Sequence, residues 1–236
     1  MKESHYIGAY WGQRLESANE CACKIVRFLD ELGRLSEIWG NWFDKGTSKR
    51  AALSNPVLPE VAGMERLLST GVHFIDSVRA SDLGYHVGIW NGVNGEHASS
   101  LSISCGGWFE RVTNCVVLKL SQSSLLTSED TPSASLGRIV GALISTFDPD
   151  SLRFSSNLLA DRLGLFDVDP KPICDPGWVT YVSPRLQQTL PGSPFLAVDP
   201  PLPDAQSCVI AGSPPFSVDD PIQVEQVRNI LKALTC

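Results

Sequence analysis

The chain has 236 residues, of which 43% are hydrophobic and 19% charged, a composition that excludes a disordered or fibrous protein. A chain of this length buries roughly 70% of the surface that its unfolded form exposes, so we expect it to fold without a metal or a disulfide. The net charge is −7, and all of it lies in residues 81–236, which hold nine bases and sixteen acids. An acidic half disfavours nucleic-acid binding and suits a basic protein partner, although the same charge could serve solubility alone.

The N-terminus and the cysteines indicate a compartment. The chain passes from its first charged residues directly into an apolar strand, without the apolar core of about 7–15 residues that a signal peptide needs. No window approaches about 18 uninterrupted apolar residues, so we expect no membrane span. The seven cysteines are odd in number and scattered, which favours free thiols in a reducing compartment. We therefore expect a cytoplasmic protein.

The first third of the chain predicts a strand, a long helix and a short aromatic segment. The strand spans His5–Trp11. A capping box at Ser17–Glu20 then opens a helix whose apolar residues recur every three or four positions, and Gly33 is its expected left-handed stop. A turn or short strand follows at Trp39–Trp42, and a short helix is expected over Val61–Leu68.

The middle of the chain predicts an antiparallel meander. Residues 85–90, 101–105 and 116–120 alternate between apolar and other side chains with a period of two. Asn91-Gly and Asn94-Gly are turn signals after the first of these segments.

A second helix is expected from about Ser135 to Phe147, where Asp148-Pro149 ends it. Short extended segments follow near Leu152–Phe154, Trp178–Val182 and Cys208–Ala211.

The last helix has the clearest start. Asp220 is its predicted N-cap, Pro221 its first residue, and Gln223 completes a capping box. The chain is thus predicted to be α+β, with a mostly antiparallel sheet and about three main helices packed on it. It forms either one domain of residues 1–236 or two intimate halves, about 1–125 and 126–236.

No recognised catalytic constellation is present in the sequence. There is no G-x-S-x-G elbow, Walker loop or dinucleotide-binding glycine loop. Cys21 and Cys23 would point about 200° apart around one helix, so they cannot hold one ion together. The histidines fall at neither H-x-H nor H-E-x-x-H spacing, which leaves a structural role for a lone residue such as His86. We expect no catalytic residue, no metal and no cofactor.

Six tryptophans are many for this length, and each lies near a glycine or an asparagine. They are Trp11, Trp39, Trp42, Trp90, Trp108 and Trp178. A tryptophan near a strand end usually belongs to the core, although the residue is also enriched at protein interfaces. Trp90 and Trp108 are the best interface candidates, because Asn91-Gly92 and Gly106-Gly107 place them near hairpin ends.

Several short segments, taken in order, resemble the immunity protein 52 family of bacterial polymorphic-toxin systems. They are Tyr6–Gly12 (YIGAYWG), Ser135–Val140 (SLGRIV), Phe147–Asp150 (FDPD), Gly177–Pro184 (GWVTYVSP), Cys208–Ala211 (CVIA) and Pro215–Pro221 (PFSVDDP). The resemblance spans nearly the whole chain. The sequence departs from the family pattern at Phe147, where Trp is usual, and at Asp150-Ser151, where a second Trp is common. These departures bear on which toxin is recognised.

The resemblance implies an antidote (an antitoxin) in interbacterial competition, which binds a cognate toxin domain and supplies no catalytic residues. Family members are associated with toxins that look like restriction-endonuclease-type nucleases, delivered by systems such as type VI secretion. A nuclease carries a basic cleft, and an acidic inhibitor can cover it. We therefore expect a toxin-binding surface among exposed acids, with the two tryptophans as anchors. The candidates are Glu96, Asp148, Asp150, Asp167, Asp169, Asp219, Asp220, Trp90 and Trp108.

Other readings of the same residues stay open. Asp148 and Asp150 could be paired carboxylates, but their position at a helix end already explains them. The chain could also be an unrecognised enzyme or a structural adaptor in a larger assembly. An enzyme would lose function on replacement of one residue such as His86 or Cys105, whereas an inhibitor would tolerate it. No nucleic acid or membrane is expected as a partner.

Overall fold

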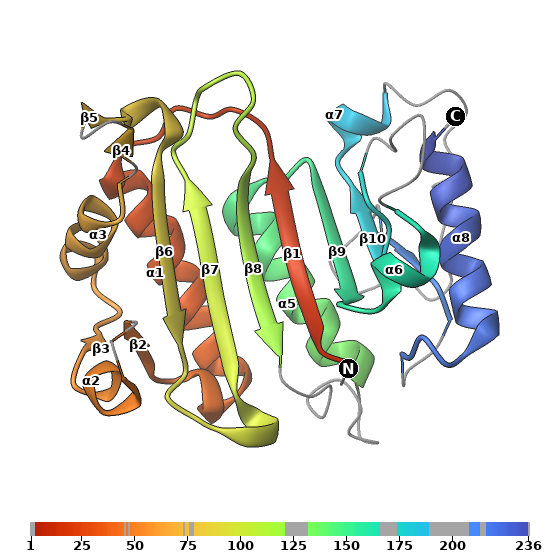
Figure 1. Cartoon of the computed structure of the whole chain (residues 1–236), viewed down its shortest axis with the longest axis horizontal. Helices are drawn as coiled ribbons and strands as arrows, with labels where there is room; N and C mark the ends of the chain where they lie inside the picture. The colour runs from red at the N-terminus through yellow and green to blue at the C-terminus, as the bar shows by residue number, and fades with distance from the viewer. Residues whose placement is uncertain are drawn as a thin grey trace. The chain divides into compact units, whose positions relative to one another are not determined.

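The computed structural model confirms an α+β fold with a mostly antiparallel sheet (Figure 1). It describes residues 3–44, 46, 48–72, 74–75, 78–120, 132–165, 174–188, 208–212 and 216–235. The chain divides into two compact units, each taken by itself below. Unit 1 comprises residues 1–9, 122–144 and 149–236, and unit 2 comprises residues 10–121 and 145–148. Among the described residues, no helix has the length and apolarity needed to cross a bilayer.

Unit 2 is built on the meander that the sequence predicts. Its strands are β2 (Trp42–Asp44), β3 (Pro56–Val57), β6 (Tyr85–Trp90), β7 (Ser99–Cys105) and β8 (Asn114–Leu120), with the end of β1 (His5–Trp11) beside β8. The order is β1-β8-β7-β6-β2-β3. In the antiparallel register Val87 faces Ile103 and Ile103 faces Val116, so apolar side chains of three strands share one face.

Alternation along β7 and β8 produces a buried face and an open face. On β7, Leu101, Ile103 and Cys105 are buried, while the serines between them are half-buried. Because successive side chains of a strand point to opposite faces, one face belongs to the core. Helix α1 (Ala18–Leu35) lies behind β6 and β7 in the view of Figure 1 and directs Ile25, Phe28 and other apolar residues into that core.

The remaining elements of unit 2 are short. They are η1 (Glu37–Trp39), α2 (Lys49–Leu53), α3 (Val61–Thr70), β4 (Phe74–Ile75), β5 (Val78–Arg79), η2 (Ser81–Leu83) and η3 (Gly95–His97). Helix α3 packs against α1 and confirms the short helix predicted over Val61–Leu68. Between β6 and β7, Gly92 and Gly95 have positive φ, as their turn signals predict.

Unit 1 contains the other strands and two of the three long helices. Its elements are α5 (Pro132–Phe147, the last residues of which belong to unit 2), β9 (Ser151–Ser156), α6 (Leu159–Leu163), β10 (Val179–Val182), α7 (Pro184–Gln187), β11 (Cys208–Ile210) and α8 (Pro221–Thr235). The strand order is β11-β10-β9-β1. Its core holds an aromatic cluster in which His5 lies 5.6 Å from Phe154 and 5.4 Å from Trp178, between ring centroids.

Helix starts were easier to predict than helix ends. Ser17 and Glu20 form the reciprocal capping box predicted for α1, but Gly33 stays helical and α1 continues to Leu35. The prediction of a left-handed stop at Gly33 is therefore wrong, and the helix ends where Ser36 becomes extended.

The start of α8 also differs in one detail from the prediction. The Asp220 carboxylate accepts hydrogen bonds from the N–H groups of Ile222 and Gln223, as an N-cap should. The Gln223 side chain accepts from the N–H of Ser217, because the N–H of Asp220 is already donated to the Ser217 carbonyl. The cap is confirmed, and the reciprocal capping box is not the arrangement found.

Candidate functional site

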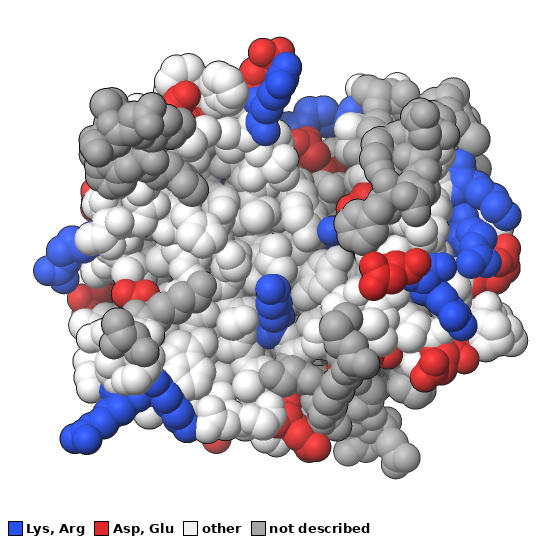
Figure 2. Space-filling model, in the orientation of Figure 1, with Lys and Arg blue, Asp and Glu red and all other residues white. Residues whose placement is uncertain are grey.

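The open face of the unit 2 sheet is the first candidate surface. No described helix of unit 2 lies over it, and Figure 2 shows it as largely uncharged, with a basic side chain rising from its middle. Its side chains are His86 and Trp90 on β6, Ser100, Ser102 and Ser104 on β7, and Cys115, Val117 and Lys119 on β8. Lys119 is the only Lys, Arg, Asp or Glu in the three strands. This face is polar but nearly neutral.

The second candidate surface lies at the end of the same sheet where β1 and β7 end and β8 begins. Three large apolar side chains are exposed there: Leu15 at 77%, Trp108 at 48% and Phe109 at 48%. Leu15 belongs to the β1–α1 loop, and the other two belong to the β7–β8 hairpin loop. We call these three residues the loop-end surface. Apolar side chains gathered on a surface are typical of an interaction site, whereas single ones need no explanation.

The hairpin loop of this surface is fixed by backbone contacts. The N–H groups of Trp108 and Phe109 both donate to the carbonyl oxygen of Asp82, at 2.9 and 3.1 Å. Gly106 has a φ of +72°, and a Cβ atom there would lie 2.7 Å from the carbonyl oxygen of Glu16, so the β1–α1 loop approaches this glycine closely. Glycine is required at this contact because no other residue fits both the space and the backbone conformation.

Asn114 joins the two loops from within the fold. Its side chain is fully buried at the start of β8. The amide oxygen accepts from the N–H of Gly107 at 2.9 Å, and the amide nitrogen donates to the carbonyl oxygens of Gly107 at 3.0 Å and Gly12 at 2.7 Å. One side chain therefore satisfies three backbone groups from two loops.

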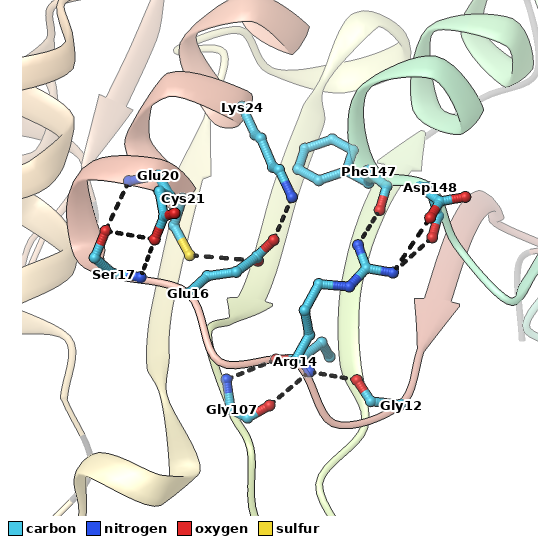
Figure 3. Close-up of polar contacts among 11 residues, drawn as sticks. Gly12, Arg14, Glu16, Ser17, Glu20, Cys21, Lys24, Gly107, Phe147 and Asp148 are labelled. Carbon is cyan, nitrogen blue, oxygen red and sulfur yellow. Dashed lines mark hydrogen bonds and ion pairs between the residues drawn. The ribbon is translucent and has the colours of Figure 1, made fainter.

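Arg14 performs the matching role at the surface (Figure 3). Its N–H donates to the carbonyl oxygen of Gly107 at 2.8 Å. Its guanidinium group donates to the carbonyl oxygens of Phe147 at 2.7 Å and Asp148 at 2.8 Å, and it lies 3.8 Å from the Asp148 carboxylate. A cation at the C-terminal end of α5 satisfies unpaired carbonyls and opposes the helix dipole. The Arg14 guanidinium group is therefore directed at groups of the fold itself, and its side chain is only 22% exposed.

A partly buried ion pair lies at the start of α1, next to the β1–α1 loop (Figure 3). Glu16 is 8% exposed at its side chain and pairs with Lys24, and the Cys21 thiol lies 3.8 Å from its other carboxylate oxygen. At the exposed end of the helix, hydrogen bonds from the Ser17 N–H and hydroxyl lower the pKa of Glu20, which holds this carboxylate in its charged form.

The thiols near this pair are unsuited to nucleophilic chemistry. A hydrogen bond with Cys21, together with burial, raises the pKa of the Cys105 thiol well above its ordinary value. A reactive cysteine needs the opposite shift, because the thiolate is the nucleophile. Within the described residues, no group of three His, Cys, Asp or Glu side chains could hold a metal ion. Glu16, Lys24 and the neighbouring thiols therefore stabilise the loop before α1, and these side chains offer no site for covalent or metal chemistry.

The six tryptophans differ in their exposure to solvent. Trp11, Trp39, Trp42 and Trp178 are all at most 4% exposed. Trp90 is half-buried on the open face, where its ring lies 6.4 Å from that of Phe43. Trp108 is in the loop-end surface. Because β6 runs from that end to the opposite one, Trp90 and Trp108 lie at opposite ends of the sheet (Figure 1).

The two predicted acidic candidates of unit 2 also lie at opposite ends of the sheet. Asp148 has a 77% exposed side chain and adjoins the loop-end surface through Arg14. Its φ of +45° shows how the chain leaves α5 before Pro149. Glu96 is exposed in η3, at the opposite end of the sheet with Trp90. The structure thus brings Asp148 and Trp108 to one end and leaves Glu96 and Trp90 at the other.

Of the three described acidic candidates of unit 1, Asp150 and Asp220 have structural roles. Asp150 forms an ion pair with Arg185, 3.0 Å from its Nε, and its carbonyl accepts from the Ser183 N–H. Asp220 caps α8, and Asp219 is exposed beside it. Asp167 and Asp169 lie outside the described residues.

Sequence reasoning missed most of the loop-end surface and the two residues that anchor its loops. Arg14, Leu15, Phe109 and Asn114 carry no periodic or motif signal, because each acts through contacts between distant segments. The one available signal was the glycine pair Gly106-Gly107 in front of Trp108 and Phe109, which indicates a tight loop bearing two aromatic residues.

Comparisons with known proteins identify one matching family model and a similar fold among solved structures. The family model described as Immunity protein 52 matches residues 3–236. Among solved structures, the chain is similar to the Pseudomonas aeruginosa T6SS protein PA0821, with a TM-score of 0.56 and 13% sequence identity over 98% of this chain and 76% of that one. None of the curated proteins matches the sequence. At 13% identity, the structural similarity is evidence for a similar fold alone.

Proposed function

The chain belongs to the immunity protein 52 family, and we propose that it binds and neutralises a cognate bacterial toxin effector. The observation that carries the proposal is the match of the family model, which covers residues 3–236 and therefore both units. Neutralisation by binding also suits a site made of loops and exposed side chains. Among the described residues, no group of three His, Cys, Asp or Glu side chains could hold a metal ion, and the pKa of the Cys105 thiol is raised.

We further propose that the effector is a nuclease delivered by type VI secretion and met in the cytoplasm. The structural neighbour is a T6SS protein, which supports the delivery route, and the acidic character of residues 81–236 supports a basic target. A nuclease needs a basic cleft for its substrate, and an acidic inhibitor can reach that cleft rapidly and cover it. Of the candidate acids, Asp148 is the best placed, because it is highly exposed and adjoins apolar residues.

Co-expression with the toxin tests this function. The C-terminal domain of the effector encoded beside the gene for this chain is expressed in a bacterium with and without the chain, survivors are counted, and the tagged chain is pulled down. Rescue together with a stable one-to-one complex is the expected result. Two folded proteins that form no complex and give no rescue would overturn the proposal. Loss of rescue in a folded His86→Ala variant that still forms the complex would instead point to an enzyme.

A further inference from the structure

We propose that the loop-end surface, Leu15, Trp108 and Phe109, is where the toxin docks, through an apolar patch on the toxin that is flanked by basic side chains. The inference rests on the proposed function and adds a location and a partner chemistry to it. Three observations support it: the side chains themselves, the rigidity of their loops, and the charges around them.

The side chains are of the kind that dominates binding energy. Tryptophan is enriched among hot-spot residues, and aromatic residues are enriched in interface cores, whereas serine is depleted. The open sheet face presents three serines at its centre. The loop-end surface presents two aromatic rings and a leucine, each between about half and three-quarters exposed. A partner that covers them removes more apolar area from water per residue than one that covers the serine column.

The loops that carry these residues are already held in place. Asn114, Arg14 and the carbonyl oxygen of Asp82 anchor the backbone beside each exposed side chain. A rigid loop loses little conformational entropy on binding, so less of the free energy gained from the apolar contact is lost to ordering the loop. Exposed apolar residues on a loosely held loop would not justify the same inference.

The charges around the surface favour a basic partner. Asp148, Glu110 and Glu20 are exposed around it, and Asp82 is half-buried beneath the hairpin. Arg111 is the exposed base of the hairpin loop. The Arg14 guanidinium is directed at backbone carbonyls, and Lys24, 31% exposed, is paired with Glu16. The balance is acidic, and an acidic rim around an apolar centre complements a basic rim around an apolar patch.

Binding of the neighbouring-gene toxin domain to surface variants tests the location. Trp108→Ala should raise the Kd about 30-fold, the effect expected of a hot-spot residue, and Leu15→Ser about 10-fold. Ile222→Ser is the matched control, because Ile222 on α8 is 70% exposed and apolar, and it should change the Kd less than about twofold. Glu110→Lys should slow association about 10-fold at low salt and much less at high salt.

The outcomes separate the two proposals. If the unmodified chain rescues cells and binds the toxin while Trp108→Ala and Leu15→Ser bind as tightly as it does, the docking surface is wrong and the immunity role stands. If the unmodified chain neither binds nor rescues, the immunity role fails. Hydroxyl-radical footprinting of the unmodified complex needs no variant to fold. Protection of Leu15, Trp108 and Phe109 supports the surface, and protection confined to Trp90 and the open face overturns it.

Discussion

The buried side chain of Asn114 both accepts a hydrogen bond from the N–H of Gly107 and donates one to its carbonyl oxygen, at 2.9 and 3.0 Å. This two-way contact closes the β7–β8 hairpin loop directly before Trp108. The position of an exposed residue is thus determined by a side chain that solvent does not reach.

Asn114→Ala should destabilise the fold and loosen the loop-end surface. The change leaves the buried N–H of Gly107 without its partner and removes one hydrogen bond each from the carbonyl oxygens of Gly107 and Gly12, which costs about 1–3 kcal/mol of unfolding free energy. Urea denaturation measures the loss, and hydrogen exchange should accelerate in residues 106–113. Asn94→Ala is the control, since Asn94 is exposed between β6 and β7 and makes no side-chain cap contact with η3. Equal exchange rates in the two variants would contradict the role of Asn114.

The partly buried ion pair of Glu16 and Lys24 predicts a non-additive mutational cycle. Lys24→Met removes the cation and leaves a carboxylate that is 8% exposed without its partner, at a cost of about 2–3 kcal/mol. In the Glu16→Gln/Lys24→Met double variant no buried charge remains, so part of that loss should be recovered. Urea midpoints of the two single variants and the double variant measure the coupling. Purely additive losses of unfolding free energy would mean that solvent screens the attraction between the two charges.

Much of the fold was predictable because its signals are local. Alternation of apolar and other side chains in the sequence predicted β6, β7 and β8, and side-chain caps predicted the starts of α1 and α8. The C-terminal end of α1 was mispredicted because glycine permits a left-handed stop without requiring one.

The site was less predictable because it depends on long-range contacts. Arg14 contacts Phe147, 133 residues away, and Asn114 contacts Gly12, 102 residues away. No period or spacing in the sequence encodes such pairs. The net charge of a segment likewise does not show which of its acids are free to bind a partner. Asp150 and Asp220 were therefore candidates, although Asp150 forms an ion pair and Asp220 caps a helix.

The cysteines should differ sharply in their reactivity toward iodoacetamide at pH 8. Cys23 is exposed on α1 and should be alkylated first. Cys105 and Cys208 are buried, and burial raises the pKa of the Cys208 thiol to about 12, so little thiolate forms there. Mass spectrometry of the alkylated peptides follows each site separately, with the urea-unfolded chain as the reference for full labelling. Alkylation of native Cys105 as fast as Cys23 would contradict the burial of this thiol.

His5 should make the stability of the chain fall as the pH drops below about 6.5. Burial lowers the pKa of this ring from its ordinary value of 6.5, and the nearby Glu3 carboxylate and the Phe216 carbonyl oppose that shift only in part. Above 6.5 the ring is neutral in both states and contributes nothing to the pH dependence. Below 6.5 the unfolded chain takes up the proton first, so stability is lost until the pH reaches the lowered pKa of the folded state.

The comparison that isolates this effect is unfolding of the unmodified chain and of His5→Gln at pH 7.5 and 5.5. The carboxylates are common to both proteins, so their contribution cancels in the difference. At pH 7.5 the variant should be the less stable of the two, because His5 lies against Phe154 and Trp178 and within 3.3 Å of the Phe216 carbonyl. At pH 5.5 the gap should narrow, because only the unmodified chain must exclude a proton from its core. A gap that stays constant between the two pH values would mean that the buried ring keeps its ordinary pKa.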